Sequence, residues 1–440
     1  MQFLYKFLSN FFKDEEDRKK LVKIIIPSFA IQSTAVLLGL VTNFVLARSL
    51  GASNYGVFTF AFSFIFPFVS FASFGVSVLV VRETPGFIAK GHHRMVKGLH
   101  KWSLLIALSV SITLAIIAIA AVYYLPLHLG IYKGPILISA AFIPLFGLMN
   151  YYCSSLRGLH KIILSQISDN IIRPGVLVLI ILFLYFYLGN LDVYTAIYAN
   201  IIAFTLGLAY AVYAFYKSTN LKGTTPEYDA RKWWIALGSL TLFNGILSLD
   251  SRLDLIMLGY IKDSTEVGAF NIAHKIAMTL FFFLSVMNTI IAPYISRLHT
   301  TNDKARLQEI LTKTVRWVMF FSLPCAILII SFSKWIMLYF GKDFEQGQTA
   351  LIILCVSQIF SISCGPVGVV SIMTGHERYN TIATLIGICF TVLLNFLLTP
   401  HLGLTGSAIA ASASILSWNI YMTIMVKKKV GVYAWVYKIN

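Results

Sequence analysis

Long apolar segments alternate with short polar segments along the whole chain, and each is close to the length of a membrane-spanning helix. A helix needs about 20 mostly apolar residues to cross the hydrocarbon core of a bilayer. The pattern therefore predicts an all-α integral membrane protein with about twelve transmembrane helices. The predicted spans are 21–46, 57–81, 102–124, 135–153, 170–189, 193–216, 233–261, 266–293, 315–340, 349–373, 380–399 and 403–426.

The composition also favours lipid as the solvent of this chain. Hydrophobic residues make up 58% of its 440 residues and charged residues only 12%, whereas soluble domains carry about 25% charged residues. Residues 1–20 lack an apolar stretch with a small-residue cleavage site, so we expect no cleaved signal peptide. The five cysteines lie in or beside apolar segments without metal-ligand spacing, and we expect neither a disulfide nor a metal site.

The net charge of +17 could suggest a nucleic-acid partner, but the lysines and arginines gather in short loops on one side of the predicted membrane. That bias is typical of the cytoplasmic face of membrane proteins. The loop at 81–102 carries Arg82, Lys90, Arg94, Lys97 and Lys101. The loops of the opposite face carry only Arg48, Lys133, Lys262 and Lys342. We therefore predict a multi-pass protein of the cytoplasmic (inner) membrane with both termini in the cytoplasm and no nucleic-acid partner.

The two halves of the chain look like parallel repeats of six helices. An offset of 212 residues places LARSLGASNYGVF (46–58) on LGYIKDSTEVGAF (258–270), and Gly56 on Gly268. Such internal repeats are common in alternating-access transporters, whose substrates bind between the lobes. The predicted division places a first lobe at 21–216 and a second lobe at 233–426. The predicted cytoplasmic parts are an N-terminal segment (1–20), a linker between the lobes (217–232) and a C-terminal tail (427–440).

Four segments resemble one known family. ARSLGASNYGVFTFAFSF after the first span looks like the LG-x₃-YG-x-F signature of polysaccharide and O-antigen flippases, which belong to the multidrug, oligosaccharidyl-lipid and polysaccharide exporters. Segments 292–311, 338–347 and 395–411 match the same family. The resemblance implies a V-shaped pair of six-helix bundles that flips lipid-linked sugar, such as undecaprenyl-linked oligosaccharide, across the membrane. The family often has up to fourteen spans, two more than this sequence predicts.

Charged residues within the spans are the main candidates for function, because a charge at the bilayer centre is costly. The seventh span holds Asp250, Arg252 and Asp254, and the eighth brings Lys275 to a similar depth, within reach of an aspartate. Asp250 and Asp254 share one helix face, and Arg252 points to roughly the opposite side. Two interpretations stay open. The four residues form a structural ion-pair network between helices, or the aspartates carry a coupling proton or sodium ion while the cations bind a diphosphate.

A further cation and several amides are candidate ligands of a substrate. Arg173 sits early in the fifth span beside Pro174, and it either reaches the cytoplasmic interface or faces the cleft. Its planar guanidinium suits a diphosphate. Four polar side chains either line the cleft and bind sugar hydroxyls or join helices by hydrogen bonds, namely Gln32, Asn43, Asn244 and Asn271.

The leading prediction is a transporter, not an enzyme, that flips polyprenyl-diphosphate-linked oligosaccharide. The first alternative is a cation-coupled exporter of small molecules, which would favour an acidic cavity. The second is a membrane-embedded polymerase or glycosyltransferase, disfavoured by short outer loops such as 189–192 and 400–403. No cofactor is predicted beyond a coupling ion, because the sequence has no nucleotide-binding glycine loop. The expected partners are the lipid-linked substrate, membrane lipids, and polymerases or glycosyltransferases of the same pathway.

Overall fold

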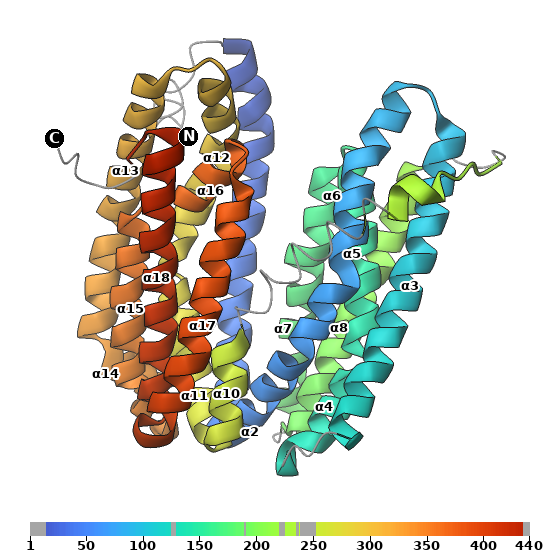
Figure 1. Cartoon of the computed structure of the whole chain (residues 1–440). Helices are drawn as coiled ribbons and strands as arrows, with labels where there is room; N and C mark the ends of the chain where they lie inside the picture. Colours follow the sequence, from blue (N-terminus) through green and yellow to red (C-terminus); the bar gives the residue numbers. More distant parts are fainter. Residues whose placement is uncertain are drawn as a thin grey trace.

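A computed structural model describes residues 15–124, 129–188, 191–219, 225–234, 237 and 252–433, all helical or connecting segments. Figure 1 shows two groups of long helices that meet at one end and separate toward the other. The chain is therefore an all-α membrane bundle with the V shape that its family resemblance implied.

Helices of the N-terminal half mostly build the right-hand group in Figure 1. The first, α2 (Glu15–Ala89), is bent at Gly51, whose φ of 69° and ψ of 171° are non-helical. The part of α2 before this bend is drawn beside the left-hand group, and the part after it enters the right-hand group. A positive φ of this kind favours glycine. The other elements of this half are α3 (His93–Tyr124), η1 (Gly130–Tyr132), α4 (Lys133–Ser139), α5 (Phe142–Gly158), α6 (Ile162–Ile167), the π-helix η2 (Ser168–Ile172), α7 (Arg173–Leu188) and α8 (Val193–Ser218).

Helices of the C-terminal half build the left-hand group. The described elements are α10 (Leu253–Ile261), α11 (Ser264–Met278), α12 (Phe281–Thr300), α13 (Lys304–Ser331), α14 (Ser333–Phe340), η4 (Lys342–Gly347), α15 (Gln348–Ser363), α16 (Val367–Met373), α17 (Glu377–Leu402) and α18 (Leu404–Val430). Asp263 and Asp303 cap α11 and α13 by accepting backbone N–H groups three residues on, at 3.0 Å each. Such caps satisfy donors that the first helical turn leaves free.

Nine helices in the described ranges are long and apolar enough to cross a membrane, or ten if the bent pair Ser264–Met278 and Phe281–Asn288 is one span. One of the nine, Ala30–Ala89, is broken at Gly51 and covers most of the first predicted span and all of the second. Most of the seventh predicted span, 233–261, lies outside the described residues. The multi-pass membrane architecture is thereby confirmed, and the predicted boundaries between lobes, linker and tail stay predictions.

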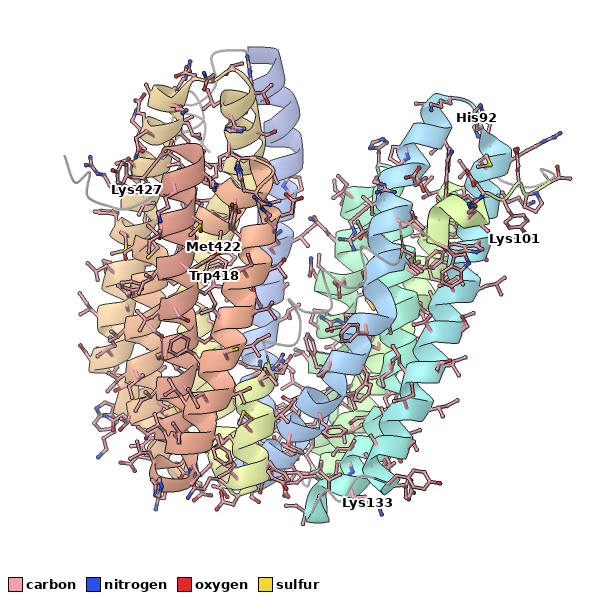
Figure 2. The ribbon with its side chains drawn as sticks, viewed as in Figure 1. His92, Lys101, Lys133, Trp418, Met422 and Lys427 are labelled. Atoms are coloured by element: carbon pink, nitrogen blue, oxygen red, sulfur yellow. The ribbon has the colours of Figure 1, made fainter. Side chains whose placement is uncertain are left out.

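The wide end of the V carries the basic loops. Figure 2 shows His92, Lys101 and Lys427 near this end and Lys133 at the joined end. By the positive-inside rule the wide end would face the cytoplasm. Part of the predicted linker returns to α3 at this end, where the Glu227 N–H donates to the Arg94 carbonyl at 3.1 Å. Trp418 and Met422, also labelled, pack in a separate apolar cluster of the left-hand group.

Candidate functional site

A cavity of about 330 Å³ lies between the two groups of helices. Its lining comes from α2, α5, α7, α8 and α11, and from Arg252 at the start of α10. Volumes of a few hundred Å³ are typical of small-molecule sites. Six phenylalanines form much of the wall, namely Phe58, Phe62, Phe66, Phe142, Phe146 and Phe204. An apolar wall with a few polar groups is the usual composition of a ligand pocket.

Three cations converge on this cavity. Arg173 enters from the N-terminal half, and Arg252 and Lys275 enter from the C-terminal half. Among the lining residues that the structure describes, none is Asp or Glu. A cluster of like charges in a partly apolar cavity attracts anions, and the low-dielectric walls strengthen that attraction. The cavity is therefore suited to an anionic ligand.

Arg173 lines the cavity directly after a π-helix. In η2 the Ser168 hydroxyl donates to the Gly207 carbonyl of α8 at 2.8 Å, which fixes the start of α7 against α8. The Arg173 guanidinium carbon then lies 4.6 Å from the centre of the Phe204 ring. Its Nε also lies 3.4 Å from Asp169 Oδ1. Single-turn π-helices recur at functional sites, and this one directly precedes a cavity-lining arginine.

Arg252 also lies against an aromatic ring. Its guanidinium carbon is 5.1 Å from the centre of the Phe66 ring, which belongs to α2 in the other half of the chain. A cation over an aromatic face is attracted by the negative face of the ring. Both arginines thus lie over rings of the cavity wall, and the Nε of Arg173 also donates to the Asp169 carbonyl at 3.3 Å.

Lys275 belongs to a hydrogen-bond network between α11 and both arms of α2. Its ammonium donates to Asn43 Oδ1, which also accepts from the Tyr55 hydroxyl at 3.0 Å. Asn271 Nδ2 donates to the Tyr55 hydroxyl at 2.9 Å and to Thr59 Oγ1 at 3.2 Å. Asn271 is 1% exposed, and its Oδ1 has no hydrogen-bond partner among the described residues. That oxygen lies buried inside the network, and the two bonds that Nδ2 donates fix the side chain.

Asp254 lies in a different network from Lys275. Asn395 Nδ2 of α17 donates to Asp254 Oδ1 at 2.8 Å. Asn395 Oδ1 in turn accepts from Thr399 Oγ1 at 2.9 Å and from Ser407 Oγ of α18 at 2.8 Å. The sequence places Lys275 within reach of an aspartate of the seventh span, but its described partner is Asn43. The carboxylate oxygen and three hydroxyl or amide side chains instead form an oxygen-rich cluster within the C-terminal half.

The remaining predicted residues differ in where they lie. Asn271 lines the cavity with the three cations. Gln32 is half-buried on the first arm of α2 and is not among the residues lining the cavity. Asp250 and Asn244 lie outside the described residues.

Tyr55 and Thr59 are members of the site that the sequence alone did not indicate. The repeat contained a signal for Thr59, since the offset of 212 places it on Asn271 and the two side chains are hydrogen-bonded. The cluster around Asp254 had a signal of a different kind. Asn395 begins one of the segments that resemble the flippase family.

Comparison with known proteins places these features in a family. A family model described as polysaccharide biosynthesis protein matches residues 21–299, and the MatE model matches residues 242–400. The chain is 26% identical over 166 residues to the probable low-salt glycan biosynthesis flippase Agl15 of Haloferax volcanii, covering 37% of this chain and 35% of the relative. It is 23% identical over 176 residues to the capsular polysaccharide biosynthesis protein CapF of Staphylococcus aureus, covering 40% and 44%. The matched segment thus spans less than half of each relative's length.

Solved structures share the fold at low sequence identity. An inward-facing multidrug resistance MATE family transporter of the MOP superfamily superposes with a TM-score of 0.77 at 14% identity, covering 92% of this chain and 98% of that one. The lipid II flippase MurJ in an inward closed conformation superposes with a TM-score of 0.71 at 16% identity, covering 91% and 87%. These likenesses confirm the exporter fold. Since the polysaccharide biosynthesis model alone matches more than half of the residues, the chain belongs to the polysaccharide biosynthesis protein family.

Proposed function

We propose that this protein is a transporter that flips polyprenyl-diphosphate-linked oligosaccharide across the cytoplasmic membrane for surface polysaccharide synthesis. The observation that carries the proposal is the convergence of Arg173, Arg252 and Lys275 on one cavity between the two halves. A diphosphate offers several anionic oxygens, and arginine forks bind such groups bidentately. The glycan relatives support the same substrate class.

The rest of the cavity suits the sugars next to the diphosphate. The Asn271 side chain lines the cavity beside the cations, and sugar rings can stack on the phenylalanine wall. A volume of about 330 Å³ holds a diphosphate and the first sugar, but no long oligosaccharide. Further sugars would extend into the wide end of the V, and the lipid tail would stay in the bilayer.

Basic residues toward the wide end, such as Lys101 and Lys427, support a cytoplasmic orientation of that end. With that end and both termini in the cytoplasm, this conformation would be an inward-facing state that receives substrate from the side where lipid-linked sugars are assembled. Glycosyltransferases that build the substrate and a polymerase that consumes it outside would be the functional partners. The two groups of helices would rock about the joined end.

A coupling ion would bind in the second lobe. The cluster of Asp254, Asn395, Thr399 and Ser407 offers one carboxylate and several neutral oxygens, which suits a proton or a sodium ion. Asp250 belongs to the same proposal from its place in the sequence, four residues before Asp254. The side chains of this cluster differ from those bonded to Lys275, so ion and substrate would bind to different side chains.

A cation-coupled exporter of small molecules is the second candidate, because the MatE model matches residues 242–400 and a MATE transporter shares the fold. The experiment that separates the two uses liposomes containing the full chain and a fluorescent undecaprenyl-diphosphate oligosaccharide. Protein-dependent access of the sugar to an enzyme on the far side is the result expected for the flippase. No such access, together with uptake of soluble organic cations, would overturn the proposal in favour of the exporter.

A further inference from the structure

The narrow end of the V is closed by direct contact between α2 and α11. The hydroxyl oxygens of Ser53 and Ser264 lie 2.9 Å apart. A Cβ atom added to Gly56 would overlap the Ser264 carbonyl oxygen, and one added to Gly268 would overlap the Ala52 carbonyl oxygen. Small residues let two helix backbones approach this closely. The repeat-equivalent glycines thus form a backbone-to-backbone seal below the cavity.

The hydrogen-bond network of the cavity continues directly from this seal. Gly268, Asn271 and Lys275 are spaced three and four residues apart, so they follow one face of α11 away from the closed end. Gly56 and Thr59 follow the facing side of α2 in the same way. The seal and the cavity are therefore joined by a single ladder of contacts between the two helices.

Asn43 is the residue where this ladder ends. It lies before the bend at Gly51, whereas its partner Tyr55 lies after it, so their hydrogen bond spans the bend of α2. The bond from Lys275 adds α11 to the same oxygen. Asn43 Oδ1 thereby ties three helical segments together at the floor of the cavity.

We infer that Lys275 is a positioning switch that releases the seal when an anionic substrate occupies the cavity. The inference rests on the proposed function, because it takes a diphosphate as the ligand. A diphosphate oxygen is a stronger acceptor for an ammonium than a neutral amide oxygen, since both partners are then ionised. A bound diphosphate draws Lys275 away from Asn43 and removes the direct link from α11 to the first arm of α2, while Asn271 stays bonded to Tyr55 and Thr59 of the second arm. The narrow end is then held by fewer contacts and opens more readily while the ligand is held in the cavity.

Cross-linking across the seal tests this inference. The full chain would carry Ser53→Cys and Ser264→Cys, with Ser in place of the half-buried Cys325 and the exposed Cys389. The initial rate of disulfide formation in detergent micelles reports closure of the narrow end. We expect saturating undecaprenyl diphosphate to lower this rate about tenfold, as for the loss of one bond to a charged group. Undecaprenol, which lacks the diphosphate, should leave the rate unchanged.

Two substitutions at Asn43 separate the switch from general effects of ligand binding. Asn43→Ala removes the acceptor, so cross-linking without ligand should already be slow. Asn43→Asp keeps the shape and binds the ammonium more tightly, so bound diphosphate should no longer slow cross-linking. Asn200→Asp is the matched control, because Asn200 also lines the cavity but bonds within its own helix, to Ala196. In the control variant the diphosphate should slow cross-linking as in the parent.

Calorimetry on the same samples makes every result decisive. If undecaprenyl diphosphate binds but the cross-linking rate does not change, the switch is wrong and the proposed flippase stands. The switch is also wrong, and the flippase again stands, if the two aspartate variants respond alike. If undecaprenyl diphosphate does not bind at all, both the proposed function and the switch are wrong.

Discussion

Replacing Lys275 by methionine separates a ligand-binding role from a structural one. If Lys275 were half of a buried ion pair, removing it would leave an uncompensated carboxylate and cost about 3–5 kcal/mol of folding stability. In the structure the ammonium donates instead to the neutral amide of Asn43, which still accepts from Tyr55 after the substitution. We therefore expect Lys275→Met to lower the free energy of unfolding by about 1.5 kcal/mol, well below the cost of breaking a buried ion pair.

The effect on ligand affinity should be much larger. A hydrogen bond to a charged group contributes about 1.5–3 kcal/mol, so its loss should weaken diphosphate binding about 10- to 150-fold. Isothermal titration of undecaprenyl diphosphate into the detergent-solubilised protein measures the affinity, and thermal unfolding of the same samples measures stability. Lys334→Met is the matched control, because Lys334 is exposed and does not line the cavity. Its Nζ lies 3.1 Å from Glu345 Oε1. That control should bind the diphosphate as the parent does.

The opposite pattern would refute the reasoning. A large fall in the unfolding temperature of Lys275→Met, with an unchanged dissociation constant, would show that Lys275 holds the helices together and does not contact the ligand. The cationic cavity would then lose one of its three members, and the structural interpretation of the charges in the spans would be preferred.

Three other substitutions test separate parts of the proposal. Asp254→Asn keeps an acceptor for Asn395, so the fold should survive. The flipping rate should fall about tenfold and no longer respond to proton or sodium gradients, as measured in liposomes with imposed gradients. Gly268→Val should prevent the seal at the narrow end and slow cross-linking between positions 53 and 264 about tenfold, because overpacking costs about 1–3 kcal/mol. Gly175 has open space around it, so Gly175→Val should leave the cross-linking rate unchanged. Arg173→Lys keeps the charge but loses the planar fork, so calorimetry should show several-fold weaker diphosphate binding with a stable fold.

Much of the architecture was predictable because its causes are local. The length of apolar segments and the placement of lysines and arginines depend on the bilayer alone. The internal repeat also indicated a contact between the halves. Its offset of 212 pairs Gly56 with Gly268, and these glycines meet at the closed end. The bend at Gly51 was not predicted. LGASNYG reads as a loop between spans, yet the backbone continues through it as helix with one non-helical residue.

The partners of the charged side chains could not be deduced from sequence. The sequence places Lys275 at the same depth in the membrane as the aspartates of the seventh span. Depth in the membrane does not say which way a side chain points around its helix axis. In the structure Lys275 faces α2 and Asn43, and Asp254 faces α17 and Asn395. Facing directions depend on how whole helices pack, and apolar periodicity is weak where lipid and neighbouring helices are both apolar.

The structure combines a symmetric seal with an asymmetric charge distribution. Equivalent positions of the two repeats form the seal, whereas the positions equivalent to Arg252 and Lys275 in the first repeat are Leu40 and Ser63. The N-terminal half supplies its cation from elsewhere, at Arg173 of α7. An anion in the cavity would therefore contact cations from both halves at once, and it would hold them together while the seal opens. In the proposed mechanism, symmetric contacts would let the two halves exchange which end is closed, and the charges of both halves would make that exchange depend on a bound anion.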